Sequence, residues 1–294
     1  MKKIELPEEL ISLQEEIRNS RDPEKPCITI CTGTGCLAYG TQKLVDNFKA
    51  EIENRNLKEK VDIRTSGCHG FCERGPMVVI HPQKIFYQRI GIDDAAEIIE
   101  KTVINGEILD RLLYTDPISG KKIIYEHEVP FYKKQMRLVF GMNGQIDPKS
   151  LEDYLAIGGY SALVKVLNGM EPEAIIEEVK KANLRGRGGG GFPTGWKWEA
   201  TRKAGGDPKY VICNADEGDP GAYMDRSLLE GNPHAVLEGM IIGAYAIGSQ
   251  EGYIYVRNEY PLAVSNITLA IEKARELGIL GEDILGSGFS FDIK

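Results

Sequence analysis

The chain has 294 residues, of which 42% are hydrophobic and 27% charged, so its length and composition fit about two ordinary globular domains. A formal net charge of −8 and a pI near 5.3 argue against nucleic acid as a partner, because phosphate binding needs a basic face. There is no apolar run of roughly eighteen residues and no apolar leader, which predicts a cytoplasmic protein without direct membrane contact.

The first third of the chain predicts a helical arm and a small α/β domain. Residues 1–24 are polar apart from a narrow apolar stripe, which indicates a docking arm. Residues 25–105 then alternate: a strand at 28–30, a helix at 41–55, strands at 61–65, 77–81 and 85–89, and a helix at 92–104. This order predicts a layered α/β domain.

Four cysteines follow the first two of these strands, namely Cys31, Cys36, Cys68 and Cys72. Clustered cysteines in a reducing compartment more often hold metal than form disulfides. Four thiolates can hold either Zn²⁺ or an iron–sulfur cluster, and their spacing alone does not decide which; buried inert thiols are a third possibility. The intervening Gly33, Gly35 and Gly70 leave N–H groups free to donate to sulfur.

Residues 106–142 carry a turn signal at 116–120 and extended runs at 123–125 and 136–140, which predicts a covering connector. A second domain is expected over residues 143–294. Asp147 and Pro148 form an N-cap and N1 pair for a helix that ends near residue 155. Further helices are predicted from residue 161 and over residues 172–182.

A glycine-rich stretch follows, with six glycines between residues 186 and 195. It satisfies G-x-G-x-x-G, but a helix rather than a strand precedes it. It is not a P-loop either, because Trp196 separates Gly195 from Lys197 and no Gly-Lys-Ser/Thr run is formed. The loop runs into a predicted helix at 196–203, whose N-terminus and Lys197 would attract an anion. A flexible linker is the alternative, although linkers rarely carry Phe192, Trp196 and Trp198.

Polar residues follow a predicted buried strand at 210–213, in the segment N-A-D-E-G-D. Ligands of open α/β sheets bind beyond the carboxyl ends of the strands, so Asn214, Asp216 and Glu217 can offer acceptors to the N–H or hydroxyl groups of a ligand. A solvated turn is the alternative. A further strand at 253–257 precedes Glu259, which either pairs with Arg257 or contacts a ligand, and His234 is expected to be structural.

The run L-R-G-R-G-G-G-G-F-P-T-G-W-K-W resembles the flavin- and NADH-binding loop of the flavoprotein subunit of respiratory complex I and its relatives. Those relatives include the beta subunits of cytosolic NAD(P)-dependent and electron-bifurcating hydrogenases and of NAD-dependent formate dehydrogenases. N-A-D-E and Y-I-Y-V-R-N-E-Y-P match the same family, and the cysteine domain resembles the thioredoxin-like [2Fe-2S] ferredoxins. A ferredoxin domain ahead of the flavin domain is most similar to the hydrogenase beta subunits.

The resemblance implies an α/β chain: a thioredoxin-like [2Fe-2S] domain followed by an incomplete α/β FMN/NADH-binding domain. The four cysteines would hold the [2Fe-2S] cluster, and no side chain would be catalytic because FMN transfers the hydride. Electrons would pass to iron–sulfur subunits, such as a small thioredoxin-like [2Fe-2S] subunit and a hydrogenase or dehydrogenase catalytic subunit. FMN and NAD(H) or NADP(H) would contact Gly186, Arg187, Gly188, Gly189, Gly190, Gly191, Phe192, Gly195, Lys197, Asn214, Asp216, Glu217 and Asp219.

The chain departs from the family pattern in a few places. Gly190 stands where the family often has alanine, and Trp196 where it often has an aliphatic residue. The family's later G-E-E-T stretch and its C-terminal cysteines for a [4Fe-4S] cluster are missing, so we expect part of a longer subunit, truncated or separately encoded. The alternative function is a non-enzymatic [2Fe-2S] electron carrier or scaffold with a vestigial flavin domain.

Overall fold

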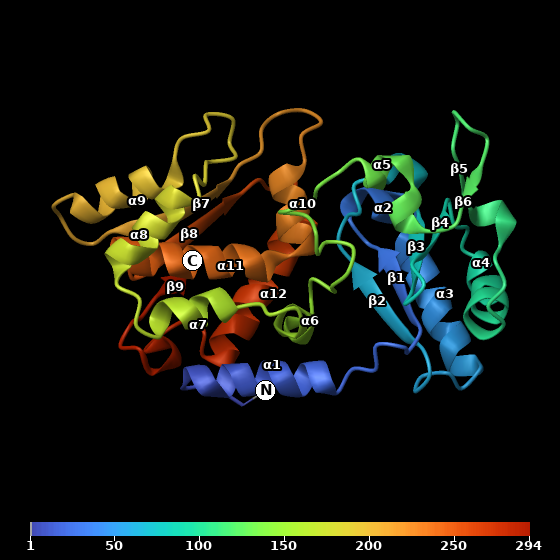
Figure 1. The fold of residues 1–294 in the computed structure, drawn as a ribbon, viewed down its shortest axis with the longest axis horizontal. Coiled ribbons are helices and arrows are strands. Elements are labelled where there is room, and N and C mark those ends of the chain that lie inside the picture. Colours follow the sequence, from blue (N-terminus) through green and yellow to red (C-terminus); the bar gives the residue numbers. More distant parts are fainter. Residues whose placement is uncertain (1) are drawn as a thin grey trace. The chain divides into compact units, whose positions relative to one another are not determined.

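The computed structural model describes residues 2–294, which divide into two compact units (Figure 1). The cysteine unit comprises residues 20–150 and 230–232, and the glycine-loop unit comprises residues 2–19, 151–229 and 233–294. The N-terminal segment therefore belongs to the unit built by the second half of the chain. No helix within residues 2–294 is long and apolar enough to cross a membrane.

The cysteine unit is built on a four-stranded sheet in the order β2-β1-β3-β4. Its strands are β1 (Cys27–Cys31), β2 (Asp62–Ser66), β3 (Met77–His81) and β4 (Ile85–Gln88). β1 pairs in parallel with β2 and antiparallel with β3, and α3 (Thr41–Asn54) makes the crossover between the parallel strands. The predicted order of strands and helices in this domain is confirmed.

Apolar side chains from the sheet and its helices form one core in this unit. Ile28, Phe48 and Tyr87 are fully buried within it, and Ile98 joins them from the closing helix. That helix begins later than predicted, as α4 (Asp94–Glu97) continuing into a π-helix, η2 (Ile98–Ile104). The Asp94 carboxylate accepts from the N–H of Gly91 at 2.7 Å, which is a turn interaction before the helix start.

The connector contains short elements rather than long strands. After η3 (Asp110–Leu112), β5 (Tyr114–Thr115) and β6 (Lys122–Ile123) form a hairpin across the predicted turn, followed by η4 (Glu126–Glu128) and α5 (Pro130–Lys133). Residues 136–140 form no strand, contrary to the prediction. The helix expected from Asp147 begins only at α6 (Leu151–Ala156), and in the turn before it the Asp147 carboxylate accepts from the Lys149 N–H and the Thr65 hydroxyl.

The glycine-loop unit contains a three-stranded parallel sheet in the order β7-β8-β9. Its strands are β7 (Tyr210–Ala215), β8 (Glu251–Val256) and the short β9 (Asp292–Ile293). The remaining elements of this half of the chain are α1 (Pro7–Asn19), α6, α7 (Ser161–Leu167), α8 (Pro172–Lys181), α9 (Thr194–Lys203), α10 (Met224–Gly231), α11 (Pro233–Ile247), α12 (Pro261–Leu277) and η5 (Ile284–Gly286).

The two faces of this sheet differ in exposure. One face packs on α11, where Gly252 leaves so little room that a Cβ would lie 2.6 Å from the Phe291 ring and 3.2 Å from Met240 Cε. The other face carries exposed side chains, namely Tyr210, Ile212, Tyr253 and Tyr255. The prediction that residues 210–213 form a buried strand is therefore wrong, because side chains alternate across a strand and only one face is covered within residues 2–294.

Glu238 of α11 connects several elements of the glycine-loop unit through a buried carboxylate. One oxygen accepts from the Tyr154 hydroxyl at 2.6 Å and from the Tyr160 N–H at 2.8 Å, and the other accepts from the Leu163 N–H at 3.1 Å. The carboxylate therefore satisfies N–H groups at the start of α7. His234, one turn earlier, is buried and bonds the Tyr160 hydroxyl, as expected of a structural histidine.

We expect Glu238→Ala to lower the free energy of unfolding of the glycine-loop unit by about 2–4 kcal/mol, because three buried donors lose their acceptor. Urea unfolding followed by tryptophan fluorescence measures this effect, since both tryptophans lie in this unit. The matched control is Glu178→Ala, whose exposed ion pair with Lys165 contributes less than about 1 kcal/mol. Equal unfolding midpoints for the two variants would contradict this role of Glu238.

Candidate functional site

Parallel pairing of β1 and β2 brings the four cysteines together. Cys31 is the last residue of β1 and lies opposite Ser66, the last residue of β2, so the loops that follow both strands leave the same edge of the sheet. Cys36 lies in the short helix α2 (Thr34–Ala38), and Cys72 begins the 3₁₀ helix η1 (Cys72–Arg74). The predicted strand-end placement of both cysteine pairs is confirmed.

The four sulfurs form a series of pairwise contacts in the order Cys36, Cys31, Cys68, Cys72. The Sγ atoms of Cys68 and Cys72 are 3.5 Å apart. The hydrogen bond with Cys36 raises the pKa of the Cys31 thiol to about 12, and that with Cys31 raises the pKa of Cys68 to about 11. Because the thiolate and not the thiol binds metal, any metal that bound here would release protons, and its positive charge would have to stabilise the thiolates.

Glycines line the cysteine site where larger residues would collide with it. A Cβ at Gly33 would lie 2.9 Å from Cys68 Cβ, and one at Gly75 would lie 2.8 Å from Cys36 Sγ. The N–H of Gly70 donates to Cys68 Sγ at 3.2 Å, and that of Gly33 hydrogen-bonds Cys31. The predicted donation from glycine N–H groups to sulfur is therefore present at these two positions. Such donors fit a group with anionic sulfurs.

Burial divides the site into an inner and an outer pair. Cys31 and Cys36 are buried, whereas Cys68 and Cys72 are partly exposed. Aromatic side chains pack beside them, and the rings of Phe71 and Phe131 are stacked with centroids 4.4 Å apart. Across residues 2–294, no group of three or more His, Cys, Asp or Glu side chains is placed so that it could hold a metal ion.

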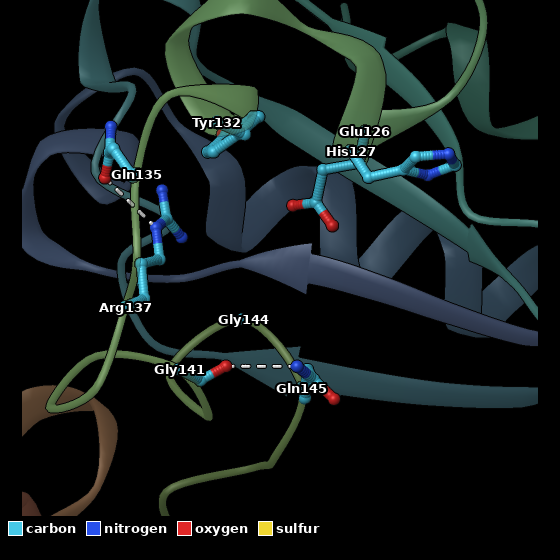
Figure 2. A pocket seen from close by; sticks show the side chains of 8 residues that line it. All are labelled: Glu126, His127, Tyr132, Gln135, Arg137, Gly141, Gly144 and Gln145. Carbon is cyan, nitrogen blue, oxygen red and sulfur yellow. Dashed lines mark hydrogen bonds between the residues drawn. The ribbon is translucent and has the colours of Figure 1, made fainter.

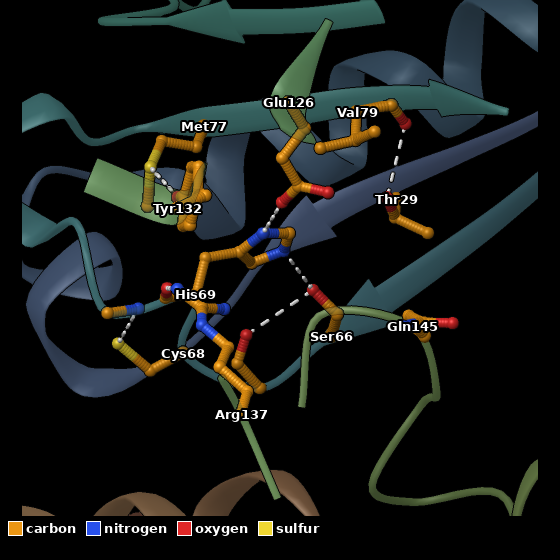
Figure 3. A network of polar contacts seen from close by, with 12 residues as sticks. Thr29, Ser66, Cys68, His69, Met77, Val79, Glu126, Tyr132, Arg137 and Gln145 are labelled. Carbon is orange, nitrogen blue, oxygen red and sulfur yellow. Dashed lines mark hydrogen bonds and ion pairs between the residues drawn. The ribbon is translucent and has the colours of Figure 1, made fainter. Parts of the chain in front are cut away.

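His69 lies between two of the cysteines in sequence, but its ring contacts other residues (Figure 3). The ring is buried, with Nε2 3.1 Å from the Ser66 hydroxyl and Nδ1 2.9 Å from the Glu126 carboxylate. Its main-chain carbonyl accepts from Arg137 Nη2 at 2.6 Å. Sequence reasoning missed Glu126 and Arg137, because both lie more than fifty residues from His69 in the connector and belong to no motif.

The same connector residues line a pocket of about 230 Å³ in the cysteine unit. Figure 2 shows Gln135 and Arg137 on one side of it and Glu126 and His127 on the other. Its lining residues are Glu126, His127, Tyr132, Gln135, Arg137, Gly141, Gly144 and Gln145. Charges of both signs line this space, so it favours neither an anion nor a cation.

The glycine loop in the other unit is closed at its base and open at its tip. Thr194 N–H donates to the Leu184 carbonyl at 2.8 Å, and Gly186 N–H donates to the Phe192 carbonyl at 2.9 Å. At the tip, a Cβ at Gly188, Gly189 or Gly190 would meet nothing within 4 Å. Gly189 has φ of 95°, whereas Gly190 has no positive φ, so alanine fits at position 190. Phe192 is 57% exposed.

The loop leads directly into α9, which begins at Thr194, two residues before the predicted start. Lys197 lies in the first turn of α9, is exposed, and forms no ion pair with any residue in the part of the chain that the structure describes. Gly195 is buried, and a Cβ there would lie 2.6 Å from Lys180 Cγ and 3.2 Å from the Ile176 carbonyl. Close packing of α8 against α9 thus explains this glycine.

The N-A-D-E segment follows β7 and is held by its own turn and by the β8–α12 loop. Asn214 Oδ1 accepts from the Asp216 N–H at 3.1 Å, and Asp216 lies 3.7 Å from Arg257. Arg257 and Tyr260 both donate to the Glu217 carbonyl at 3.0 Å. Arg257 also forms an ion pair with Glu259 at 3.3 Å, which is one of the two roles predicted for Glu259.

The carboxylate of Glu217 has a structural role that its sequence position does not reveal. It is buried and accepts hydrogen bonds from three main-chain N–H groups. The donors are Met224, Asp225 (3.3 Å) and Arg226 (3.2 Å). Three donors at the start of α10 therefore share this one carboxylate. Asp219 is exposed, and no hydrogen bond or ion pair links the glycine loop to residues 214–219 within residues 2–294.

Comparison with known families agrees with this division into units. Residues 17–103 match the thioredoxin-like [2Fe-2S] ferredoxin family, and residues 179–291 match the Nuo51 FMN-binding domain family. Fold and site thus define an FMN-binding flavoprotein with an N-terminal thioredoxin-like [2Fe-2S] domain. The chain is similar to subunits of NADH-quinone oxidoreductases and to the hydrogenase subunit HndC, and its second half matches part of an FMN-binding domain.

Similar proteins are considerably longer than the segment they share with this chain. The NADP-reducing hydrogenase subunit HndC of Solidesulfovibrio fructosivorans is 54% identical over 162 residues, covering 55% of this chain and 33% of that protein. An NADH-quinone oxidoreductase subunit of Aquifex aeolicus is 54% identical over 144 residues, covering 49% of this chain and 33% of that protein. A solved NAD⁺-reducing [NiFe]-hydrogenase is 22% identical, covering 98% of this chain and 46% of that chain, with a TM-score of 0.41. The matched segment thus spans about a third of the curated relatives.

We expect Glu217→Gln to lower the free energy of unfolding of the glycine-loop unit by about 1–2 kcal/mol, because a charged acceptor at the start of α10 is lost. Asp216→Asn is the matched control, since Asp216 is about half exposed and should change stability by less than about 1 kcal/mol. Urea unfolding monitored by tryptophan fluorescence compares the two. An unfolding midpoint unchanged by Glu217→Gln would show that its carboxylate is not needed to cap α10.

Proposed function

We propose that this chain is part of a cytoplasmic flavoprotein subunit that exchanges hydride between NAD(P)H and FMN and passes single electrons to iron–sulfur clusters. The observation that carries the proposal is the pairing, in one chain, of a four-cysteine site with a glycine loop that leads to the exposed Lys197. Single-electron transfer needs an iron–sulfur site such as the four cysteines, and hydride exchange needs a site for the flavin and the nicotinamide. Two family matches and relatives named as hydrogenase and NADH-quinone oxidoreductase subunits support it.

The cysteine unit would hold a [2Fe-2S] cluster on Cys31, Cys36, Cys68 and Cys72. Each iron of such a cluster takes two protein thiolates, and pairwise sulfur contacts suit that arrangement. Glycine N–H groups that point at Cys31 and Cys68 would offset the negative charge that the cluster gains on reduction. The partly exposed outer pair offers the route for electrons to and from other subunits.

The glycine-loop unit would hold the FMN phosphate where the loop meets α9. The first turn of a helix presents N–H groups and the positive end of its dipole, and Lys197 adds a full charge in that turn. The loop residues Gly186, Arg187, Gly188, Gly189, Gly190 and Gly191 leave its backbone open to a close approach. A single phosphate suits FMN better than FAD, because no strand–glycine–helix unit for a dinucleotide precedes this loop.

The nicotinamide would stack near Phe192, the large apolar side chain among the glycines, which is mostly exposed. Asn214, Asp216 and Asp219 would offer acceptors to the flavin ring or to ribose hydroxyls, while Glu217, whose carboxylate caps α10, would hold the segment in position. When bound, FMN accepts two electrons as a hydride and releases them one at a time. This chain's residues would bind and orient the two ligands.

Partners of this subunit would be iron–sulfur electron-transfer proteins, including a small thioredoxin-like [2Fe-2S] subunit and a hydrogenase or dehydrogenase catalytic subunit. A [4Fe-4S] cluster is expected only on the part of the relatives that this chain does not match. The similarity to subunits of a hydrogenase and of an NADH-quinone oxidoreductase supports an assembly of this kind.

The cysteine assignment predicts that the full-length protein, reconstituted anaerobically, contains iron and acid-labile sulfide in equal amounts and gives an EPR signal on reduction. We expect Cys68→Ser to lose most of the cluster, because serine replaces a thiolate ligand. Cys27→Ser is the matched control on the same strand as Cys31, and it should keep the cluster. Stoichiometric zinc without iron or sulfide in the wild-type protein would refute the assignment.

The flavin assignment predicts that acid extraction of the full-length protein yields FMN and that Lys197→Ala weakens FMN binding about 10- to 100-fold, because a charge-assisted phosphate contact is lost. Phe192→Ala should instead raise the apparent KM for NAD(P)H several-fold to about tenfold at unchanged flavin content. Fluorescence titration with FMN and steady-state kinetics separate the two effects.

The matched control is Lys203→Ala, which removes the same charge from the same helix but from a lysine that pairs with Glu199. It should leave both FMN affinity and KM unchanged. Extraction of FAD, or full FMN affinity in Lys197→Ala, would contradict the placement of the phosphate. A protein that holds its cluster but never binds flavin would instead support the electron-carrier alternative.

A further inference from the structure

We propose that Arg137 is a positioning residue for the [2Fe-2S] cluster: it fixes the peptide group that donates to Cys68 and places a permanent positive charge beside that ligand. The proposal rests on the proposed function, because it takes Cys68 to be a cluster ligand. It concerns a residue from the connector, which lies between the two family matches at residues 17–103 and 179–291.

A single peptide group links Arg137 to the sulfur. The carbonyl of His69 accepts from Arg137 Nη2 at 2.6 Å, and the N–H of the same peptide group, which belongs to Gly70, donates to Cys68 Sγ at 3.2 Å. Hydrogen bonding at the carbonyl polarises the peptide group and strengthens its N–H as a donor. Gly70 itself has φ of 88°, a conformation that glycine adopts readily.

Arg137 is itself held in place, unlike a loose surface side chain. Its Nε donates to Gln135 Oε1 at 3.2 Å, and its guanidinium lies over the Tyr132 ring, 4.6 Å from the centroid. Guanidinium remains charged at all ordinary pH values, and its planar geometry gives each N–H a fixed direction. Figure 3 shows Arg137 next to Cys68 and His69.

The connector also contacts the ring of His69. Glu126 bonds the His69 ring at 2.9 Å, and the Ser66 hydroxyl lies 3.1 Å from the opposite ring nitrogen. A Cβ at Gly144 would lie 2.7 Å from the ring, so the imidazole has no room to rotate toward the connector backbone. With the ring fixed in this way, the Arg137 contact holds the peptide group between His69 and Gly70.

This geometry predicts an effect on the reduction potential. A reduced cluster carries one more negative charge, which both the nearby positive charge and the Gly70 N–H stabilise. In Arg137→Met the reduced form should therefore be disfavoured, and at a fixed applied potential the ratio of reduced to oxidised cluster should fall about three- to tenfold. A tenfold change corresponds to about 59 mV for one electron.

The test is a redox titration of the full-length protein followed by EPR, with the wild type, Arg137→Met and Arg137→Gln. Both variants lose the charge and should show a lower midpoint potential and altered g-values, because the donor geometry at Cys68 changes. Arg111→Met is the matched control: it removes an arginine of the same unit that pairs with Asp94 at 2.7 Å and with Glu97. It should match the wild type.

A wild-type potential and EPR spectrum in either loaded Arg137 variant would overturn the proposal. If both variants fold, as judged by circular dichroism, but lose the cluster while Arg111→Met keeps it, the positioning role is supported. Failure of the proposed function gives a different result: the wild-type protein itself would then assemble no [2Fe-2S] cluster under anaerobic reconstitution.

Discussion

The parallel pairing of β1 with β2 is the constraint on which the cysteine unit depends. Its register sets Cys31 opposite Ser66, so two loops that are far apart in sequence leave the sheet side by side. A shift of one residue would turn every side chain of one strand to the other face. The fully buried Ile28 and Ile30 on β1 resist such a shift, and the hydrophobic core thereby fixes the positions of the sulfurs.

In both units, main-chain N–H groups are placed where they can donate hydrogen bonds. In the cysteine unit, the N–H groups of Gly33 and Gly70 bond sulfur, and a Cβ at Gly33 would collide with Cys68. In the glycine-loop unit, the backbone is open at the tip of the loop and at the start of α9. Both places gain donors for negative charge without using many charged side chains, which suits a chain with a net charge of −8.

Two buried carboxylates stabilise the fold of the glycine-loop unit. Glu217 caps α10, and the buried Glu238 caps α7, so each supplies acceptors to backbone donors at a helix start. The main-chain carbonyl of Glu217 is held by Arg257 and Tyr260 as well. The N-A-D-E segment is therefore fixed from both its side-chain and its backbone atoms before any ligand arrives.

The sequence by itself determined the order of strands and helices in the cysteine unit, the strand-end placement of the cysteines and the helix–loop–helix around the glycines. These features follow from local periodicity, from glycine and from short motifs, which act over a few residues. Only the tertiary structure decided the contacts of His69 with Glu126 and Arg137, the capping role of Glu217 and the exposed face of β7. Each of these depends on which distant segment packs against a residue, and no local pattern encodes that choice.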